Sequence, residues 1–178
     1  MKVRYSYLPQ QFGDCDDLWD ELKAFVATGD FTLGKPLESF EEQFSELIGT
    51  QHAIGVNSGT DAIKLSLKAL GIGPGDEVIT APNSFIASAA SIARTGAKVV
   101  LSDVGDDMNL DPKELDKAIG PTTKAIMPVH LTGKVANMEA ILSISESYGL
   151  FVVEDAAQAP GCKYKGRYVG TIGDIGIF

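Results

Sequence analysis

Short apolar segments rich in β-branched residues alternate with helical segments through most of this 178-residue chain, and this alternation constrains the fold more than any other feature. The apolar segments predict strands at residues 53–56, 78–80, 98–101, 124–129 and 150–153. The periodicity between them predicts helices at residues 60–70 and 84–94, from Asp111-Pro112 onward, and at residues 137–148. Because strands joined through helices need crossover connections, the pattern predicts an α/β fold with a mostly parallel sheet.

The N-terminal part of the chain shows helical periodicity without strands. We interpret residues 1–50 as an N-terminal helical segment that leads into a large domain at residues 51–178. The first expected helix begins with Asp14 as its cap and ends at Gly29, and a second amphipathic helix ends at Gly49. These two helices carry much of the negative charge, which is typical of a solvated face.

The C-terminal part of the chain also departs from the alternation. Residues 163–169 are expected to form a small hairpin that turns at Gly166. A further apolar strand begins at residue 172 and runs up to Phe178, where the chain stops without a turn or a polar tail. Mature domains seldom stop in mid-strand, so we expect a truncated chain.

Composition narrows the classes of function. The formal net charge is −9, and Lys and Arg form no clustered stripe, which argues against nucleic acid and anionic membranes as partners. No apolar run is long enough to span a bilayer and no signal-peptide core follows Met1, so a cytoplasmic protein is expected. Cys15 and Cys162 have no metal or redox spacing, which favours two reduced thiols and gives no indication of a metal centre.

The segment at residues 151–158 holds the most informative candidate site. An apolar run stops at Glu154-Asp155, and Gln158 follows three residues after the second acid. Ligands bind at the carboxyl ends of parallel strands, and a carboxylate beside a pyridine nitrogen keeps that nitrogen protonated. Gln158 lies on the same side if the chain coils there, and it can then donate to a ring oxygen. The alternative is an acid that caps a turn, and Glu154 is expected to be structural.

Two further candidates lie where a strand gives way to a helix. In the segment at residues 57–61, Gly59 permits close approach of the backbone, while Ser58 and Thr60 add hydroxyl groups to the N–H groups of a helix start, an arrangement that binds anions. The alternative is an ordinary capped helix. Phe85 follows the next strand, where it is expected either to stack on a flat cofactor or to pack in the core.

These candidates are more specific together than separately. An anion site, a stacking aromatic ring and a ring-nitrogen acid occur in this order, each at the end of a strand, and this combination describes a pyridoxal phosphate pocket. His52 and His130 have no partner at a metal-ligand spacing and are interpreted as hydrogen-bonded histidines, although His130 lies at a strand end. No Ser–His–Asp arrangement is apparent.

The chain resembles the DegT/DnrJ/StrS family of sugar aminotransferases, which are pyridoxal-phosphate-dependent enzymes of fold type I. The motifs that carry the resemblance extend over essentially the whole chain and are found at residues 29–34 (GDFTLG), 57–62 (NSGTDA), 71–79 (GIGPGDEVI), 84–88 (SFIAS), 128–130 (PVH) and 154–158 (EDAAQ). The resemblance implies a three-layer α/β/α large domain with a mostly parallel sheet, incomplete at its C-terminus and without the small C-terminal domain.

The resemblance also implies roles for individual residues. Gly59 and Thr60 would hold the cofactor phosphate, Phe85 would stack on the pyridine ring, Asp155 would pair with the ring nitrogen, and Gln158 would contact the ring hydroxyl. Enzymes of this family are homodimers whose pockets take residues from both subunits. They transfer an amino group, usually from glutamate, to a keto sugar linked to a nucleotide.

One departure from the family pattern concerns catalysis. The Schiff-base lysine of the family lies a few residues beyond the motif that matches residues 173–178, and no lysine of this chain matches it. The expected function is therefore that of the N-terminal part of a sugar aminotransferase, and the chain by itself is expected not to transaminate. Two alternatives are a related sugar dehydratase, which has histidine in place of that lysine, and an inactive truncated product that acts by binding a partner.

Overall fold

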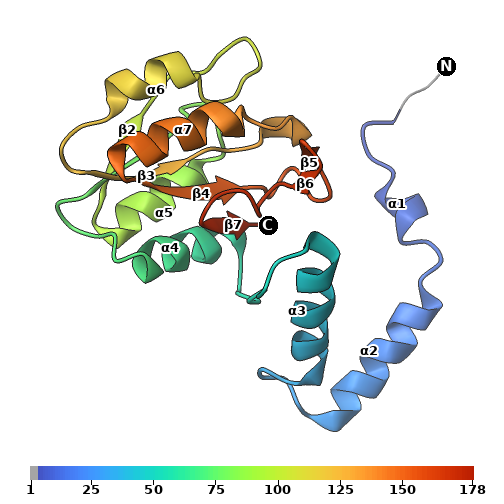
Figure 1. Ribbon diagram of the computed structural model, residues 1–178. Coiled ribbons are helices and arrows are strands. Elements are labelled where there is room, and N and C mark those ends of the chain that lie inside the picture. The colour runs from blue at the N-terminus through green and yellow to red at the C-terminus, as the bar shows by residue number, and fades with distance from the viewer. Residues whose placement is uncertain (1–3) are drawn as a thin grey trace.

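A five-stranded parallel sheet in the order β2-β1-β3-β4-β7 forms the centre of the fold in the computed structural model, which describes residues 4–178 (Figure 1). Its strands are β1 (Glu77–Thr80), β2 (Lys98–Leu101), β3 (Thr123–Met127), β4 (Phe151–Asp155) and β7 (Ile175–Ile177). Every neighbouring pair is parallel. The four expected strands from residue 78 to residue 153 are confirmed, and their bounds differ from the predicted ones by two residues at most.

Helices cover both faces of the sheet and make the predicted three-layer α/β/α arrangement (Figure 1). Successive strand residues point to opposite faces, so Val153 packs in the core beneath one pair of helices and Val152 in the core beneath the other. A sheet that is buried on both faces explains the nearly continuous apolar strands. The first pair is α4 (Gly59–Ala69) and α5 (Ile86–Thr95), and the second is α6 (Pro112–Ala118) and α7 (Met138–Tyr148).

Helix caps follow from the local sequence. Asp111 accepts a hydrogen bond from the N–H of Lys113 (2.9 Å) at the start of α6, where Pro112 occupies the first turn, as predicted. Asn137 accepts one from the N–H of Ala140 (3.3 Å) at the start of α7. These caps satisfy N–H groups that have no partner within the helix, and they fix where each helix begins.

Helices α1 (Leu8–Gln11) and α2 (Asp16–Thr28) lie apart from this domain, whereas the next helix, α3 (Lys35–Ile48), reaches it through Phe44, whose ring packs edge-on against Phe178. Figure 1 shows α1 and α2 extending away from the sheet, with α3 between them and the domain. Helices α2 and α3 end at Gly29 and Gly49, both in the left-handed conformation, as the sequence predicts. Asp14 is not the cap of α2, because the helix begins two residues later and Cys15 occupies the capping position.

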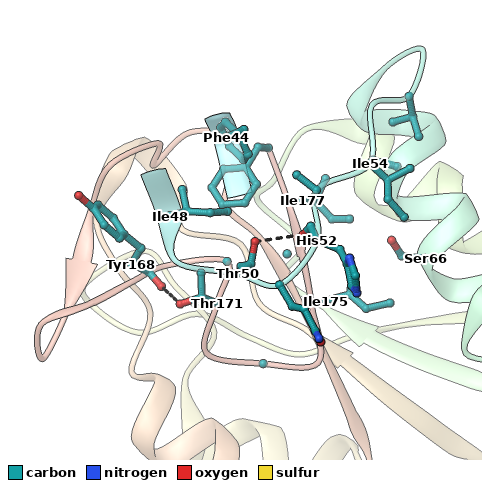
Figure 2. Close-up of a pocket in the computed structure, with 18 of the residues that line it drawn as sticks. Phe44, Ile48, Thr50, His52, Ile54, Ser66, Tyr168, Thr171, Ile175 and Ile177 are labelled. Atoms are coloured by element: carbon teal, nitrogen blue, oxygen red, sulfur yellow. Dashed lines mark hydrogen bonds between the residues drawn. The ribbon is translucent and has the colours of Figure 1, made fainter. Parts of the chain in front are cut away.

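The predicted strand at residues 53–56 is wrong. This segment joins no sheet, and the Ile54 side chain is 79% exposed. A groove of about 1080 Å³ separates it from β7, so its backbone has no strand neighbour to pair with (Figure 2). Within residues 4–178, β7 is hydrogen-bonded to β4 on one side only, which leaves its other edge facing that groove.

The predicted hairpin is confirmed as β5 (Lys163–Tyr164) and β6 (Arg167–Tyr168), which pair in antiparallel fashion. Lys165 and Gly166 both have positive φ, as a two-residue hairpin turn of the primed type requires. Cys15 and Cys162 are free thiols, in agreement with the sequence analysis. No helix within residues 4–178 is both long enough and apolar enough to cross a membrane.

Candidate functional site

Helix α5 links two of the predicted site segments. The Ser91 hydroxyl donates to the carbonyl oxygen of Thr60 in the first turn of α4 (3.0 Å). One turn earlier, the Ser88 hydroxyl lies 3.3 Å from Oδ2 of Asp155 and donates to it. The start of α4, the start of α5 and the carboxyl end of β4 therefore meet at one edge of the sheet, where ligands bind in parallel α/β folds.

Asp155 is a buried carboxylate without a cationic partner. Its side chain is 7% exposed, and Oδ1 accepts a hydrogen bond from the N–H of Ala157 (3.3 Å). Burial raises the pKa of Asp155, and the hydrogen bonds from Ala157 and Ser88 offset this effect only in part. No Lys or Arg of residues 4–178 forms an ion pair with it. A cationic group bound here, such as a protonated pyridine nitrogen, would supply the missing countercharge.

Glu154 faces the opposite side of the sheet, as strand alternation requires. It is fully buried and accepts hydrogen bonds from His130 Nε2 (3.2 Å) and from the N–H groups of Gly170, Ile172 and Gly173. Burial acts to raise the Glu154 pKa, but these hydrogen bonds outweigh it, so the net effect is a lowered pKa. The interpretation of His130 as a hydrogen-bonded histidine is confirmed, and the structure adds that its ring is fully buried.

Gln158 lies in the turn after β4, and its side chain is oriented by a neighbouring loop. Its Oε1 accepts a hydrogen bond from the N–H of Thr132 (2.7 Å). Its amide nitrogen makes no hydrogen bond to any of residues 4–178, so both of its N–H groups can donate to a ligand. The loop that holds Gln158 includes a short 3₁₀ turn, η1 (Leu131–Gly133), which the sequence analysis did not predict.

The start of α4 is a capped helix turn with open space beside it. Ser58 is extended and its Oγ accepts a hydrogen bond from the N–H of Asp61 (3.2 Å), while Asn57 donates to the Asp61 carboxylate (3.2 Å). A Cβ placed on Gly59 would meet no atom within 4 Å, so the space above this turn is free. The N–H groups of Gly59 and Thr60 belong to the first turn, where no partner exists within the helix. This geometry therefore suits both an ordinary capped helix start and a helix start that binds an anion.

Phe85 stands at the N-terminus of α5 and does not pack in the core. Its side chain is 70% exposed, which excludes the alternative of core packing for this ring. The preceding loop is held by Asn83, whose amide nitrogen donates to the carbonyl oxygen of Met108 (2.9 Å). An exposed aromatic ring one turn before Ser88 is available to cover a flat ligand.

Two serine residues that were not predicted from the sequence support the site. Ser88 and Ser91 lie in an Ala/Ser-rich helix, and their spacing of three is the signal that places both on one helix face. His52 was interpreted as hydrogen-bonded, whereas it is exposed and lines the groove of Figure 2, and its ring makes no hydrogen bond to residues 4–178. This groove includes Ser58 and Gly59 at its rim but none of Phe85, Asp155 and Gln158.

Known proteins resemble this chain over most of its length. The sequence profile of the DegT/DnrJ/EryC1/StrS aminotransferase family matches residues 15–178. The chain is 45% identical over 159 residues to the spore coat polysaccharide biosynthesis protein SpsC of Bacillus subtilis, covering 89% of this chain and 41% of that protein. It is 43% identical over 176 residues to the dTDP-3-amino-3,4,6-trideoxy-alpha-D-glucose transaminase of Streptomyces venezuelae, covering 94% of this chain and 46% of that protein.

Solved structures give the same result. A DegT DnrJ EryC1 StrS aminotransferase from Brucella abortus superposes with a TM-score of 0.93 at 35% identity, covering 98% of this chain and 49% of that chain. NtdA from Bacillus subtilis, solved with bound cofactor PMP, superposes with a TM-score of 0.87 at 36% identity, covering 96% and 40%. The chain thus spans less than half the length of each of these proteins.

Proposed function

Because the chain belongs to the DegT/DnrJ/EryC1/StrS aminotransferase family, we propose that it is the cofactor-binding part of a pyridoxal-phosphate-dependent aminotransferase. The proposed acceptor is a keto sugar linked to a nucleotide, and the proposed amino donor is glutamate. A relative is named as a transaminase of a dTDP-linked amino sugar, which supports this substrate class. The observation that carries the proposal is the buried Asp155 carboxylate, which lies without a cation beside the starts of α4 and α5.

Each site residue has one proposed task. Asp155 accepts a hydrogen bond from the protonated pyridine nitrogen and keeps its proton in place, and Gln158 donates its free N–H to the ring oxygen. Gly59 and Thr60 bind the phosphate with N–H groups at the positive end of the α4 dipole. Phe85 covers one face of the ring and excludes water from it. When bound, the cofactor supplies an electron sink for carbanions.

The choice between amino transfer and dehydration rests on the relatives. The names of two of them include a transaminase and a protein of polysaccharide biosynthesis, and the family itself is one of aminotransferases, so the sugar dehydratase alternative is not favoured. We infer that the 178-residue chain does not transaminate, since none of its lysines matches the Schiff-base position of the family. Borohydride reduction with pyridoxal phosphate should then leave no pyridoxyl group at a single specific lysine, and robust turnover would contradict this inference.

We also propose that the protein is a homodimer, with residues 1–50 as a helical segment beside the cofactor-binding domain at residues 51–178. Helix α2 has no buried residue, and its exposed apolar side chains share one stretch of helix: Leu18, Trp19, Leu22 and Val26. Burying them against a second copy would remove this apolar surface from water. Sedimentation of Trp19→Glu beside the unchanged chain tests this, and a dimer of equal strength in both would contradict the role given to α2.

Binding of pyridoxamine phosphate tests the proposed function without any Schiff-base lysine. We expect calorimetric titration of the chain to show one site for this ligand. Pyridoxamine, which lacks the phosphate, should bind about tenfold or more weakly, because hydrogen bonds to a charged group contribute about 1.5–3 kcal/mol. Inorganic phosphate should compete with pyridoxamine phosphate. The absence of binding, or equal binding of both amines, would contradict the proposed site.

A further inference from the structure

We propose that the buried His130–Glu154 pair is a positioning device, which fixes the loop at residues 131–135 and thereby holds the Gln158 amide with its nitrogen free to donate. The part of this inference that concerns the cofactor rests on the proposed function. The part that concerns the loop rests on the structure of the chain alone. Neither residue of the pair lies on the face of β4 that carries Asp155, so the pair acts through the chain and not by touching the cofactor.

Glu154 anchors the pair because all its acceptor positions are used. Its Oε1 accepts the N–H groups of Ile172 and Gly173, each at 2.6 Å. Its Oε2 accepts the N–H of Gly170 (2.9 Å) and Nε2–H of His130 (3.2 Å). A carboxylate offers about four acceptor positions, so the set is complete. An amide in its place would turn one acceptor into a donor that faces other donors.

His130 transmits this anchor to the neighbouring loop. Its Nδ1 accepts the N–H of Ala136 (3.2 Å), so the ring proton lies on Nε2, where it is donated to Glu154. The backbone of His130 continues the link, since its N–H donates to the carbonyl oxygen of Asp155 (3.0 Å) and its carbonyl oxygen accepts the N–H of Gly133 (3.3 Å). One fully buried residue, through its ring and its backbone, therefore ties both ends of the loop to the end of β4.

Thr132 lies at the tip of this loop in a conformation that needs support. Its φ of 56° is in the left-handed region, which a β-branched residue adopts only where the surrounding structure holds it. Its N–H is the donor that orients Gln158 Oε1. Asn109 supports the loop from the other side, accepting the N–H of Leu131 (3.2 Å) and donating to the carbonyl oxygen of Lys134 (3.1 Å). Loss of the His130–Glu154 pair should therefore loosen the loop without releasing it entirely.

A purely stabilising function is a poor account of this pair. A buried hydrogen-bonded pair adds little net stability compared with apolar groups of the same shape, because desolvation of the polar groups offsets their hydrogen bond. What such a pair does impose is geometry, since each of its hydrogen bonds has a direction. Here the bond that His130 Nδ1 accepts from Ala136 ends at the loop whose Thr132 N–H contacts Gln158.

Glu154→Gln and Gln158→Ala, made singly and together, separate positioning from stability. In Glu154→Gln we expect the amide hydrogen of Thr132 to exchange about tenfold faster or more, because its hydrogen bond to Gln158 is no longer held, while the Leu67 amide in the core of α4 keeps its protection. Each single change should weaken pyridoxamine phosphate binding by about twofold to tenfold, the value of one ordinary hydrogen bond of about 0.5–1.5 kcal/mol. The double change should weaken it no further. Glu139→Gln, at a 71%-exposed side chain paired with Lys165, is the matched control.

Each outcome decides one part of the inference. Unchanged Thr132 exchange in Glu154→Gln, or losses of affinity that add in the double variant, would overturn the positioning role. If the unchanged chain does not bind pyridoxamine phosphate, the proposed function fails, while Thr132 exchange still decides whether the pair fixes the loop. If Glu154→Gln does not fold, His130→Gln replaces it, because that change leaves the three backbone hydrogen bonds of Glu154 in place.

Discussion

Asp155→Asn should strengthen the fold and weaken the site at the same time. The Asp155 carboxylate is buried without a cation, and burial raises its pKa above its ordinary value of 3.8. Asparagine keeps the shape, its oxygen can still accept the N–H of Ala157, and its amide nitrogen can donate to the Ser88 hydroxyl. The substitution therefore removes a desolvated charge without leaving a buried polar group unpaired.

The pH dependence of the free energy of unfolding shows whether the Asp155 charge stabilises or destabilises the fold. A carboxyl group whose pKa is higher in the folded than in the unfolded chain destabilises the fold when it is ionised. For Asp155 this destabilisation is absent below pH 3.8 and grows as the pH rises through the pKa of the folded state. Each unit of raised pKa lowers the free energy of unfolding by about 1.4 kcal/mol at higher pH. Glu154 has the opposite sign, because its pKa is lowered from 4.5, and its contribution is lost only as the medium becomes more acidic.

Urea unfolding of the unchanged chain and of Asp155→Asn, compared at matched pH values from pH 3.8 upward, isolates Asp155, since the contribution of Glu154 is common to both proteins. The unchanged chain should lose stability relative to Asp155→Asn as the pH rises above 3.8, and Asp155→Asn should be the more stable protein at pH 8. Pyridoxamine phosphate should bind the variant about tenfold to a hundredfold more weakly, because a hydrogen bond to a charged group contributes about 1.5–3 kcal/mol. A variant that is less stable at pH 8, or that binds the ligand as tightly, would refute the reasoning.

Three further substitutions test the site and the fold. Gly59→Ala should leave the free energy of unfolding within about 1 kcal/mol of that of the unchanged chain, since the added Cβ meets no atom within 4 Å. The same methyl group should lower the affinity for pyridoxamine phosphate, because it blocks the approach of the phosphate to the backbone. Equal affinity in a titration would contradict this expectation. Phe85→Ala should change stability little, because the ring is 70% exposed. It should weaken ligand binding by about 0.5–1.5 kcal/mol through the loss of stacking, and calorimetric titration measures this change. Gly176→Ala should destabilise the chain by about 1–3 kcal/mol in urea unfolding, because its Cβ would lie 2.6 Å from the Cα of Gly170; an unaffected midpoint would show that this backbone contact relaxes.

Local sequence signals were sufficient for the order of elements. Apolar β-branched runs, Asp111-Pro112 at the start of α6, and Gly29 and Gly49 after their helices act over a few residues, so a pattern read along the chain identifies them. The strand predicted at residues 53–56 shows the limit of such signals. Its composition suits a strand, but a strand needs a neighbour for its hydrogen bonds, and the groove beside β7 leaves it none within residues 4–178.

The position of Asp155 at the end of an apolar run was readable from the sequence alone, because strand ends in parallel sheets are where side chains meet ligands. Only the tertiary structure decided its environment: the burial that raises its pKa, the Ser88 hydroxyl brought from 67 positions earlier in the chain, and the absence of an ion-pair partner among residues 4–178. The same holds for Glu154, whose partners come from two separate segments, His130 after β3 and residues 170–173 before β7. Residue type and local order are properties of the sequence, whereas charge state and orientation depend on neighbours that folding brings together from distant parts of the chain.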